Sequence, residues 1–230
     1  VSRPEEVERY VHLPTLGVVP DFLMAAKESK GAVNGNGSAQ INGNGSARIN
    51  GNGSRNGANS HDNALVVSHP PLSLVAESYR SLQTSILLSQ AEEPPRVVLF
   101  TSGCRVEGKT ATAINTAIVF AQMEARVLVI DADLRRSSCH EILGLARNPG
   151  LTELLTGQRT LEEVIRPTMT DNLFLITGGA IPPDPVKLVG SQKMHEILTR
   201  LREQFDYIFI DSPPLIAASV PLKGMYAVCR

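Results

Sequence analysis

Residues 96–110 read RVVLFTSGCRVEGKT, an apolar run followed by a glycine-containing loop. The run Arg96–Thr101 is rich in β-formers and predicts a buried strand. The loop matches the pattern G-x-x-x-x-G-K-[ST], in which successive backbone N–H groups at a helix N-terminus surround a polyphosphate. A chance glycine-rich turn is the alternative. The strand before the loop and the helical pattern of Thr110–Met123 after it are, however, the context that the motif requires, so we predict a phosphate-binding loop.

Three positions of this loop have individual physical roles. Gly108 allows the backbone to approach a phosphate closely, Lys109 reaches the terminal phosphates, and the Thr110 hydroxyl can bind magnesium. The predicted nucleotide-binding residues are Gly103, Cys104, Arg105, Val106, Glu107, Gly108, Lys109 and Thr110.

Short apolar runs alternate with helical patterns along the rest of the chain. The predicted strands are 96–101, 127–130, 173–176 and 207–210, and the predicted helices are 72–90, 110–123, 151–155, 161–165 and 191–204. Such alternation is typical of an α/β fold with a mostly parallel sheet flanked by helices on both faces. In these sheets the ligand binds at the carboxyl ends of the strands.

Aspartates follow two of these strands at the point where each strand ends. Asp131 and Asp133 come after 127–130, and Asp211 comes after 207–210. Beside a phosphate loop, carboxylates can hold magnesium or accept a proton from a nucleophile. A helix cap or turn is the ordinary role of one such aspartate, but three of them near this loop favour chemistry. Whether Asp131 or Asp133 would accept the proton stays open.

The composition fits a globular α/β protein. Of the 230 residues, 42% are hydrophobic and 20% are charged, and the formal net charge of -1 gives no reason to expect nucleic acid as a partner. Cys104, Cys139 and Cys229 lack metal-ligand spacing, so we expect no disulfide or zinc framework and a reducing cytoplasm. No apolar run approaches the ~20 residues of a membrane-spanning helix, and we expect the chain to be soluble.

The chain divides into four parts. Residues 1–30 contain one short apolar run broken by two prolines. Residues 31–69 hold an eight-residue repeat of Asn, Gly and Ser with one apolar residue per unit, which predicts a flexible linker. Residues 70–219 carry the strand and helix patterns, and 220–230 form a divergent tail. Because the first residue is Val, we expect the chain to be a piece of something longer.

Together the motifs resemble the bacterial tyrosine kinases (BY-kinases) of capsule and exopolysaccharide biosynthesis. The loop resembles their Walker A motif, Asp131-x-Asp133-x-Arg135 their Walker A′ motif, and Ile210-Asp211-Ser-Pro-Pro214 their Walker B motif. Glu77-Ser-Tyr-Arg80 resembles the start of the E-x-x-R-x-x-R helix that mediates ring assembly in the family. Further family-like segments are 150–157, 179–188 and 16–20, the last of which resembles the juncture after the membrane-spanning chain-length domain.

The resemblance implies a protein-tyrosine autokinase with a P-loop NTPase fold that uses ATP and Mg²⁺. Lys109 and either Asp131 or Asp133 would be catalytic, whereas Thr110, Asp131 and Asp211 would hold the metal. Glu77 and Arg80 would lie at an oligomer interface. The implied partners are a membrane-spanning activator domain (fused or separate), further copies in a ring and a cognate tyrosine phosphatase, at the cytoplasmic face of the inner membrane.

Several departures from the family pattern bear on activity. Arg105-Val106 stands where the family has Pro-Gly, and Gln83 replaces the last arginine of the assembly motif, which weakens the ring prediction. After residue 219 we expect the later strands and the C-terminal tyrosine cluster to be missing, which would leave an open sheet edge. Tyr79 falls in a predicted helix and Tyr207 in a predicted strand, so neither is an obvious acceptor.

Two alternatives to a kinase stay open. A nucleotide-dependent switch or scaffold would resemble the partitioning and division-site ATPases, which carry a signature lysine where this chain has Cys104. The absence of that lysine argues against the switch, and the absence of a tyrosine cluster argues for it. The second alternative is an inactive truncated fragment of the kinase.

Overall fold

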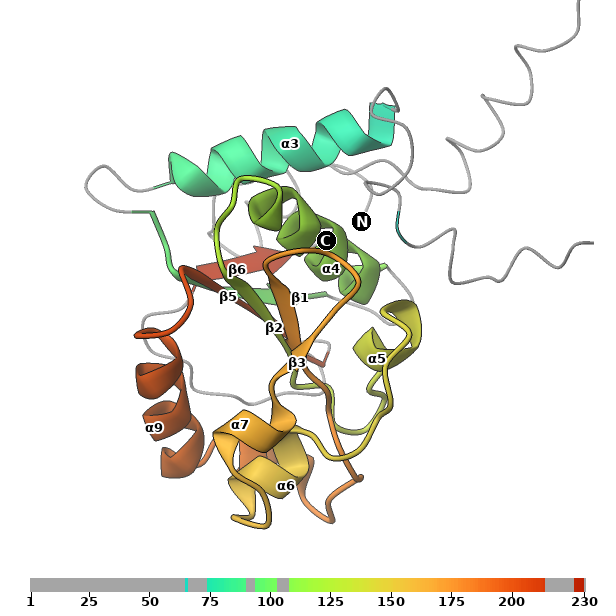
Figure 1. Ribbon diagram of the computed structural model, residues 1–230, viewed down its shortest axis with the longest axis vertical. Coiled ribbons are helices and arrows are strands. Elements are labelled where there is room, and N and C mark those ends of the chain that lie inside the picture. Colours follow the sequence, from blue (N-terminus) through green and yellow to red (C-terminus); the bar gives the residue numbers. More distant parts are fainter. Residues whose placement is uncertain (1–64, 66–73, 90–93, 103–107, 214–225, 230) are drawn as a thin grey trace, which may run out of the picture.

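A six-stranded sheet forms the centre of the computed structural model, which describes residues 65, 74–89, 94–102, 108–213 and 226–229 (Figure 1). The strand order is β3-β4-β2-β5-β1-β6. The strands are β1 (Val97–Thr101), β2 (Val127–Asp131), β3 (Arg166–Pro167), β4 (Leu173–Ile176), β5 (Tyr207–Asp211) and β6 (Tyr226–Cys229). All neighbours pair in parallel except β3 and β4, which are antiparallel. The predicted parallel α/β sheet is therefore confirmed.

Helices cover both faces of the sheet, as predicted (Figure 1). On one face lie α3 (Leu74–Leu87) and α4 (Lys109–Ala121), which contact each other. On the other face lie α6 (Leu151–Leu155), α7 (Leu161–Val164), α8 (Pro185–Val189) and α9 (Gln192–Leu201). The single-turn helix α5 (Cys139–Ile142) joins the α3–α4 side.

Two apolar cores follow from the alternation of side chains along the strands. Val98 and Phe100 of β1 pack with α3 and α4, whereas Val97 belongs to the core under α6 to α9. Phe209 of β5 packs edge-on against Phe100 with ring centroids 5.5 Å apart. Every residue of β2 is buried, which explains why its sequence is a continuous apolar run.

The structure differs from the sequence prediction in its short elements. Sequence analysis assigned no strand after 207–210, but β6 pairs in parallel with β1, with Val98 opposite Tyr226. Thus β1 is an interior strand of this sheet. The two-residue strand β3 and the short helices α5 and α8 were also not predicted, whereas the equally short helices α6 and α7 were. Elements of two to five residues show too little periodicity for consistent assignment.

Several predicted segments lie outside the described residues. These are 1–30, nearly all of the linker 31–69, the loop residues 103–107 and most of the tail 220–230. Within the described residues, no helix has the length and apolar character needed to cross a membrane.

Candidate functional site

The site lies where β1, β2 and β5 end and α4 begins. Asp131 and Asp211 are the last residues of β2 and β5, and the parallel register places them directly opposite each other. Gly108 precedes α4 with a φ of 75°, a left-handed conformation that glycine adopts without the steric cost of a Cβ. The following residues, Lys109 and Thr110, therefore start the helix next to the two carboxylates.

Asp211 joins the phosphate loop to the sheet. Its Oδ1 accepts from the Lys109 ammonium in an ion pair, and its Oδ2 accepts from the Thr110 hydroxyl at 2.7 Å. Burial raises the pKa of the Asp211 carboxyl to about 6, with Lys109 acting in the opposite direction and the neighbouring Asp131 adding to the rise. Lys109 is therefore paired with the Asp211 carboxylate in this structure.

Asp131 is held from one side only. Its Oδ2 accepts three hydrogen bonds, from the Ser137 hydroxyl at 2.8 Å and from the backbone N–H groups of Ser138 and Cys139 at 3.0 Å each. Its Oδ1 is buried and finds no hydrogen-bond partner among the described residues. Burial raises the pKa of this carboxyl, although the hydrogen bonds oppose the rise. An orphaned buried oxygen of this kind fits a cation that is bound during function.

The loop after β2 supplies three residues that sequence analysis missed. Cys139 places its Sγ 3.7 Å from Asp211 Oδ2, and one ligand atom each from Asp131, Cys139 and Asp211 lie within 4.8 Å of one another. Ser138 donates from its hydroxyl to Thr110 Oγ1 at 3.3 Å, and Ser137 contacts Asp131. Burial and the two carboxylates raise the pKa of the Cys139 thiol well above its usual value. Only the proximity of these residues to the Asp-x-Asp pattern could have singled them out.

The oxygen donors of the site fit magnesium. Mg²⁺ prefers carboxylate and hydroxyl oxygens and retains several waters. Thr110, Asp131 and Asp211 offer that set, and the structure brings all three together. The three residues predicted to bind metal are therefore neighbours in the structure.

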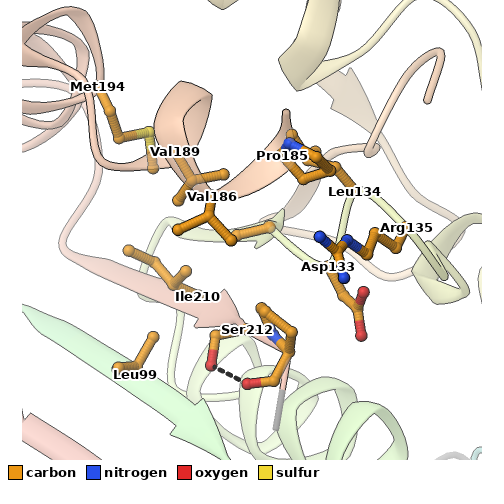
Figure 2. A pocket seen from close by; sticks show the side chains of 12 residues that line it. Leu99, Asp133, Leu134, Arg135, Pro185, Val186, Val189, Met194, Ile210 and Ser212 are labelled. Atoms are coloured by element: carbon orange, nitrogen blue, oxygen red, sulfur yellow. Dashed lines mark hydrogen bonds between the residues drawn. The ribbon is translucent and has the colours of Figure 1, made fainter. Parts of the chain in front are cut away.

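Asp133 does not belong to this buried group. It is partly exposed, and its Oδ1 accepts from the backbone N–H of Arg136 at 3.1 Å. Asp133 and Arg135 lie at one end of a recess (Figure 2). The space in this recess, including the part that is open to solvent, is about 530 Å³. The rest of the recess is mostly apolar and is lined by Leu99, Ala132, Leu134, Pro185, Val186, Val189, Met194, Ile210, Ser212 and Pro213.

The predicted assembly residues lie elsewhere, on α3. Glu77 is exposed and pairs with Arg80 on the same helix. Gln83, which stands in place of the last arginine of that motif, is turned inward. Its amide donates to the Val119 carbonyl of α4 at 3.0 Å and contacts Met123 Sδ at 2.8 Å. Gln83 therefore binds α3 to α4 within the chain.

Comparison with known proteins identifies relatives over the described fold. A family profile described as an AAA domain matches residues 106–225, just over half of the chain. The tyrosine-protein kinase YwqD of Bacillus subtilis is 34% identical over 163 residues, which cover 71% of this chain and 68% of the relative. The tyrosine-protein kinase ptk of Acinetobacter johnsonii is 38% identical over 146 residues, which cover 64% of this chain and 20% of that protein.

A solved structure agrees with these sequence matches. The kinase domain of the Escherichia coli tyrosine kinase ETK superposes with a TM-score of 0.72 at 26% identity, covering 95% of this chain and 76% of the other. The chain thus spans about two thirds of the Bacillus relative and a fifth of the Acinetobacter relative.

Proposed function

The chain belongs to the family of bacterial tyrosine-protein kinases, and we propose that it transfers a phosphoryl group from Mg²⁺-bound ATP to a protein tyrosine. The observation that carries this proposal is the convergence of Lys109, Thr110, Asp131 and Asp211 at one edge of the sheet. Phosphoryl transfer depends mainly on positioning and on charge neutralisation, and this edge offers the groups for both.

On the phosphate side, Lys109 exchanges partners. In the structure it pairs with Asp211 and is nearly buried, with 9% of its side chain exposed. We infer that it swings to the terminal phosphates of ATP and leaves the Asp211 carboxylate to Thr110 and the metal. Mg²⁺ held by Thr110, Asp131 and Asp211 would neutralise the charge that spreads over the phosphate oxygens.

On the acceptor side, the two nearby aspartates have different access. Asp131 has no exposed surface and uses one oxygen in three hydrogen bonds, so a phenolic hydroxyl in solvent does not contact it in this structure. Asp133 is partly exposed and lines the apolar recess beside Pro185 and Val186 (Figure 2). We therefore assign the role of general base to Asp133 and the role of metal anchor to Asp131. An apolar recess with a carboxylate at its rim suits a tyrosine ring.

The finer biological role also belongs to this proposal. Two matched relatives are named CapB and EpsB, which supports a role in capsule or exopolysaccharide biosynthesis. The family resemblance supports a membrane-spanning activator domain, a ring of copies, a cognate phosphatase and a place at the cytoplasmic face of the inner membrane. The inward position of Gln83 weakens the ring contact, because no arginine is presented there.

Incubation of the chain with γ-labelled ATP and Mg²⁺, followed by detection of phosphotyrosine, tests the function. A tyrosine-rich peptide supplied in trans serves as acceptor, because Tyr79 is buried and Tyr207 lies in the interior strand β5. Phosphotyrosine on the peptide that forms with the wild-type chain and is absent with Lys109→Ala supports the kinase. Bound ATP without any transfer, to the peptide or to the chain, would instead identify a nucleotide-dependent switch.

A further inference from the structure

A buried thiol lies among the carboxylates of the proposed magnesium site. Cys139 Sγ is 3.7 Å from Asp211 Oδ2, and the ligand atoms of Asp131, Cys139 and Asp211 all lie within 4.8 Å of one another. The three side chains come from separate parts of the edge, the end of β2, the start of α5 and the end of β5. This donor set includes a sulfur atom, which Mg²⁺ does not use because it takes oxygen ligands.

Sulfur in the set changes the class of ion that suits it. Thiolates select zinc and softer divalent ions over magnesium. A metal that binds sulfur at roughly 2.3 Å and oxygen at roughly 2.1 Å in a tetrahedral arrangement separates those ligands by roughly 3.6 Å. The observed distance between Cys139 Sγ and Asp211 Oδ2 is close to that separation.

Asp131 provides the second and independent observation. Its Oδ1 has no hydrogen-bond partner among the described residues, although the residue is completely buried. Its Oδ2 is oriented by the Ser137 hydroxyl and by two backbone N–H groups. Ligands held by such outer contacts are pre-oriented, which strengthens metal binding.

Cys139 also has a structural role in the core. It is fully buried and packs in the apolar core beside α3 and α4, where a small thiol behaves as an apolar side chain. A thiol with that role alone would fill space and would not respond to a metal. The two roles therefore differ in what a soft metal ion does to the protein.

We propose that Asp131, Cys139 and Asp211 form a binding site for a thiophilic divalent cation of the zinc and cadmium class, which overlaps the magnesium site. On binding, the Cys139 Sγ–H proton passes to the buffer, and Lys109 gives up its ion pair with Asp211 to the metal. The binding itself stands without the proposed kinase activity, whereas the competition with Mg²⁺ rests on that function. A thiophilic ion bound through Cys139 thus inhibits the proposed kinase by competing with Mg²⁺.

Cadmium chloride titrated into the nucleotide-free full chain tests the site. The chain with Cys104→Ser and Cys229→Ser retains only Cys139 and is expected to develop the ultraviolet sulfur-to-cadmium charge-transfer band at one equivalent. Addition of Cys139→Ser to that chain should abolish the band and weaken cadmium binding, measured by calorimetry, at least ~10-fold. Asp131→Asn changes a direct ligand and should weaken binding at least as much as the loss of an outer contact to a ligand, roughly 10- to 100-fold, while the thiol remains.

Circular dichroism of each variant establishes that it is folded before the titration. A chain with Cys139 alone that develops no band would overturn the site, as would an undiminished band after Cys139→Ser. The overlap is tested by titrating Mg²⁺-ADP with and without cadmium, where cadmium should raise the apparent Kd for the nucleotide. Simultaneous binding without competition would overturn the overlap. Failure of Mg²⁺-ADP to bind in the absence of cadmium, with the band intact, would count against the proposed kinase and not against the metal site.

Discussion

Asp131 and Asp133 are two residues apart in the chain, yet they occupy different chemical environments. Asp131 ends β2, is fully buried and accepts three hydrogen bonds on one oxygen. Asp133 lies past the strand, partly exposed, at the rim of the apolar recess. The difference arises because the last residue of an interior strand faces its neighbour across the sheet, as Asp131 faces Asp211, whereas two residues later the backbone has left the sheet. This difference in burial is the basis on which we propose that Asp131 holds the metal and Asp133 meets the acceptor.

The largest expected effect comes from replacing Asp131 and Asp133 by asparagine one at a time, which distinguishes the metal anchor from the general base. Asp133→Asn should retain binding of Mg²⁺-ATP and lose transfer by roughly 10²- to 10⁴-fold, the contribution of a general base. Asp131→Asn should instead weaken the magnesium dependence of nucleotide binding. Calorimetry and a phosphotyrosine assay measure the two effects, with the exposed Asp171→Asn as control. An equal loss of Mg²⁺-ATP binding in Asp131→Asn and Asp133→Asn would contradict the assignment of different roles to the two residues.

Removal of Lys109 affects the buried carboxylate pair Asp131 and Asp211 and leaves Asp133 unchanged. Lys109→Ala should reduce transfer by roughly 10²- to 10³-fold, because a preorganised charge at the transferring phosphate is lost. The matched control is Lys193→Ala, an exposed lysine on α9 that should leave the rate unchanged. Transfer that survives Lys109→Ala would show that phosphates bind elsewhere.

The pH dependence of the free energy of unfolding tests the burial of Asp211, the carboxylate that lies opposite Asp131. Asp211 has a pKa raised from 3.8 to about 6 in the folded protein, so the folded state holds its proton more tightly than the unfolded state does. Its contribution to stability is therefore complete below about pH 4 and is lost as the pH rises through about 6. Urea unfolding of wild type should show this decline between those values, and Asp211→Asn should show a smaller decline, because Asp131, whose pKa burial also raises, still contributes. Parallel curves for the two proteins would contradict the burial argument.

The smallest expected effect concerns the loop that orients Asp131. Ser137→Ala removes the hydroxyl that donates to Asp131 Oδ2 at 2.8 Å and should lower the free energy of unfolding by about 1–3 kcal/mol. Ser85→Ala on the partly exposed side of α3 is the control, with an expected change within about 0.5 kcal/mol. Urea unfolding compares the two, and an equal loss in both would mean that the hydrogen bond to Asp131 contributes nothing special.

The sequence by itself determined the parallel α/β sheet and the start of α4 to within one residue, and it singled out Lys109, Thr110 and Asp211 as candidate site residues. These follow from local patterns, because a buried strand is a continuous apolar run and a phosphate loop has a fixed spacing. The sequence also placed Asp131 and Asp133 after the same strand, but it could not tell their roles apart.

Only the tertiary structure decided which carboxylate is buried, that Gln83 faces α4, that β6 pairs with β1, and that Cys139 joins the two aspartates. Burial and partner choice depend on contacts between residues far apart in the chain, such as Cys139 and Asp211, which are separated by 72 positions. Local periodicity carries no record of such contacts, since the strand order that creates them is a property of the packed sheet.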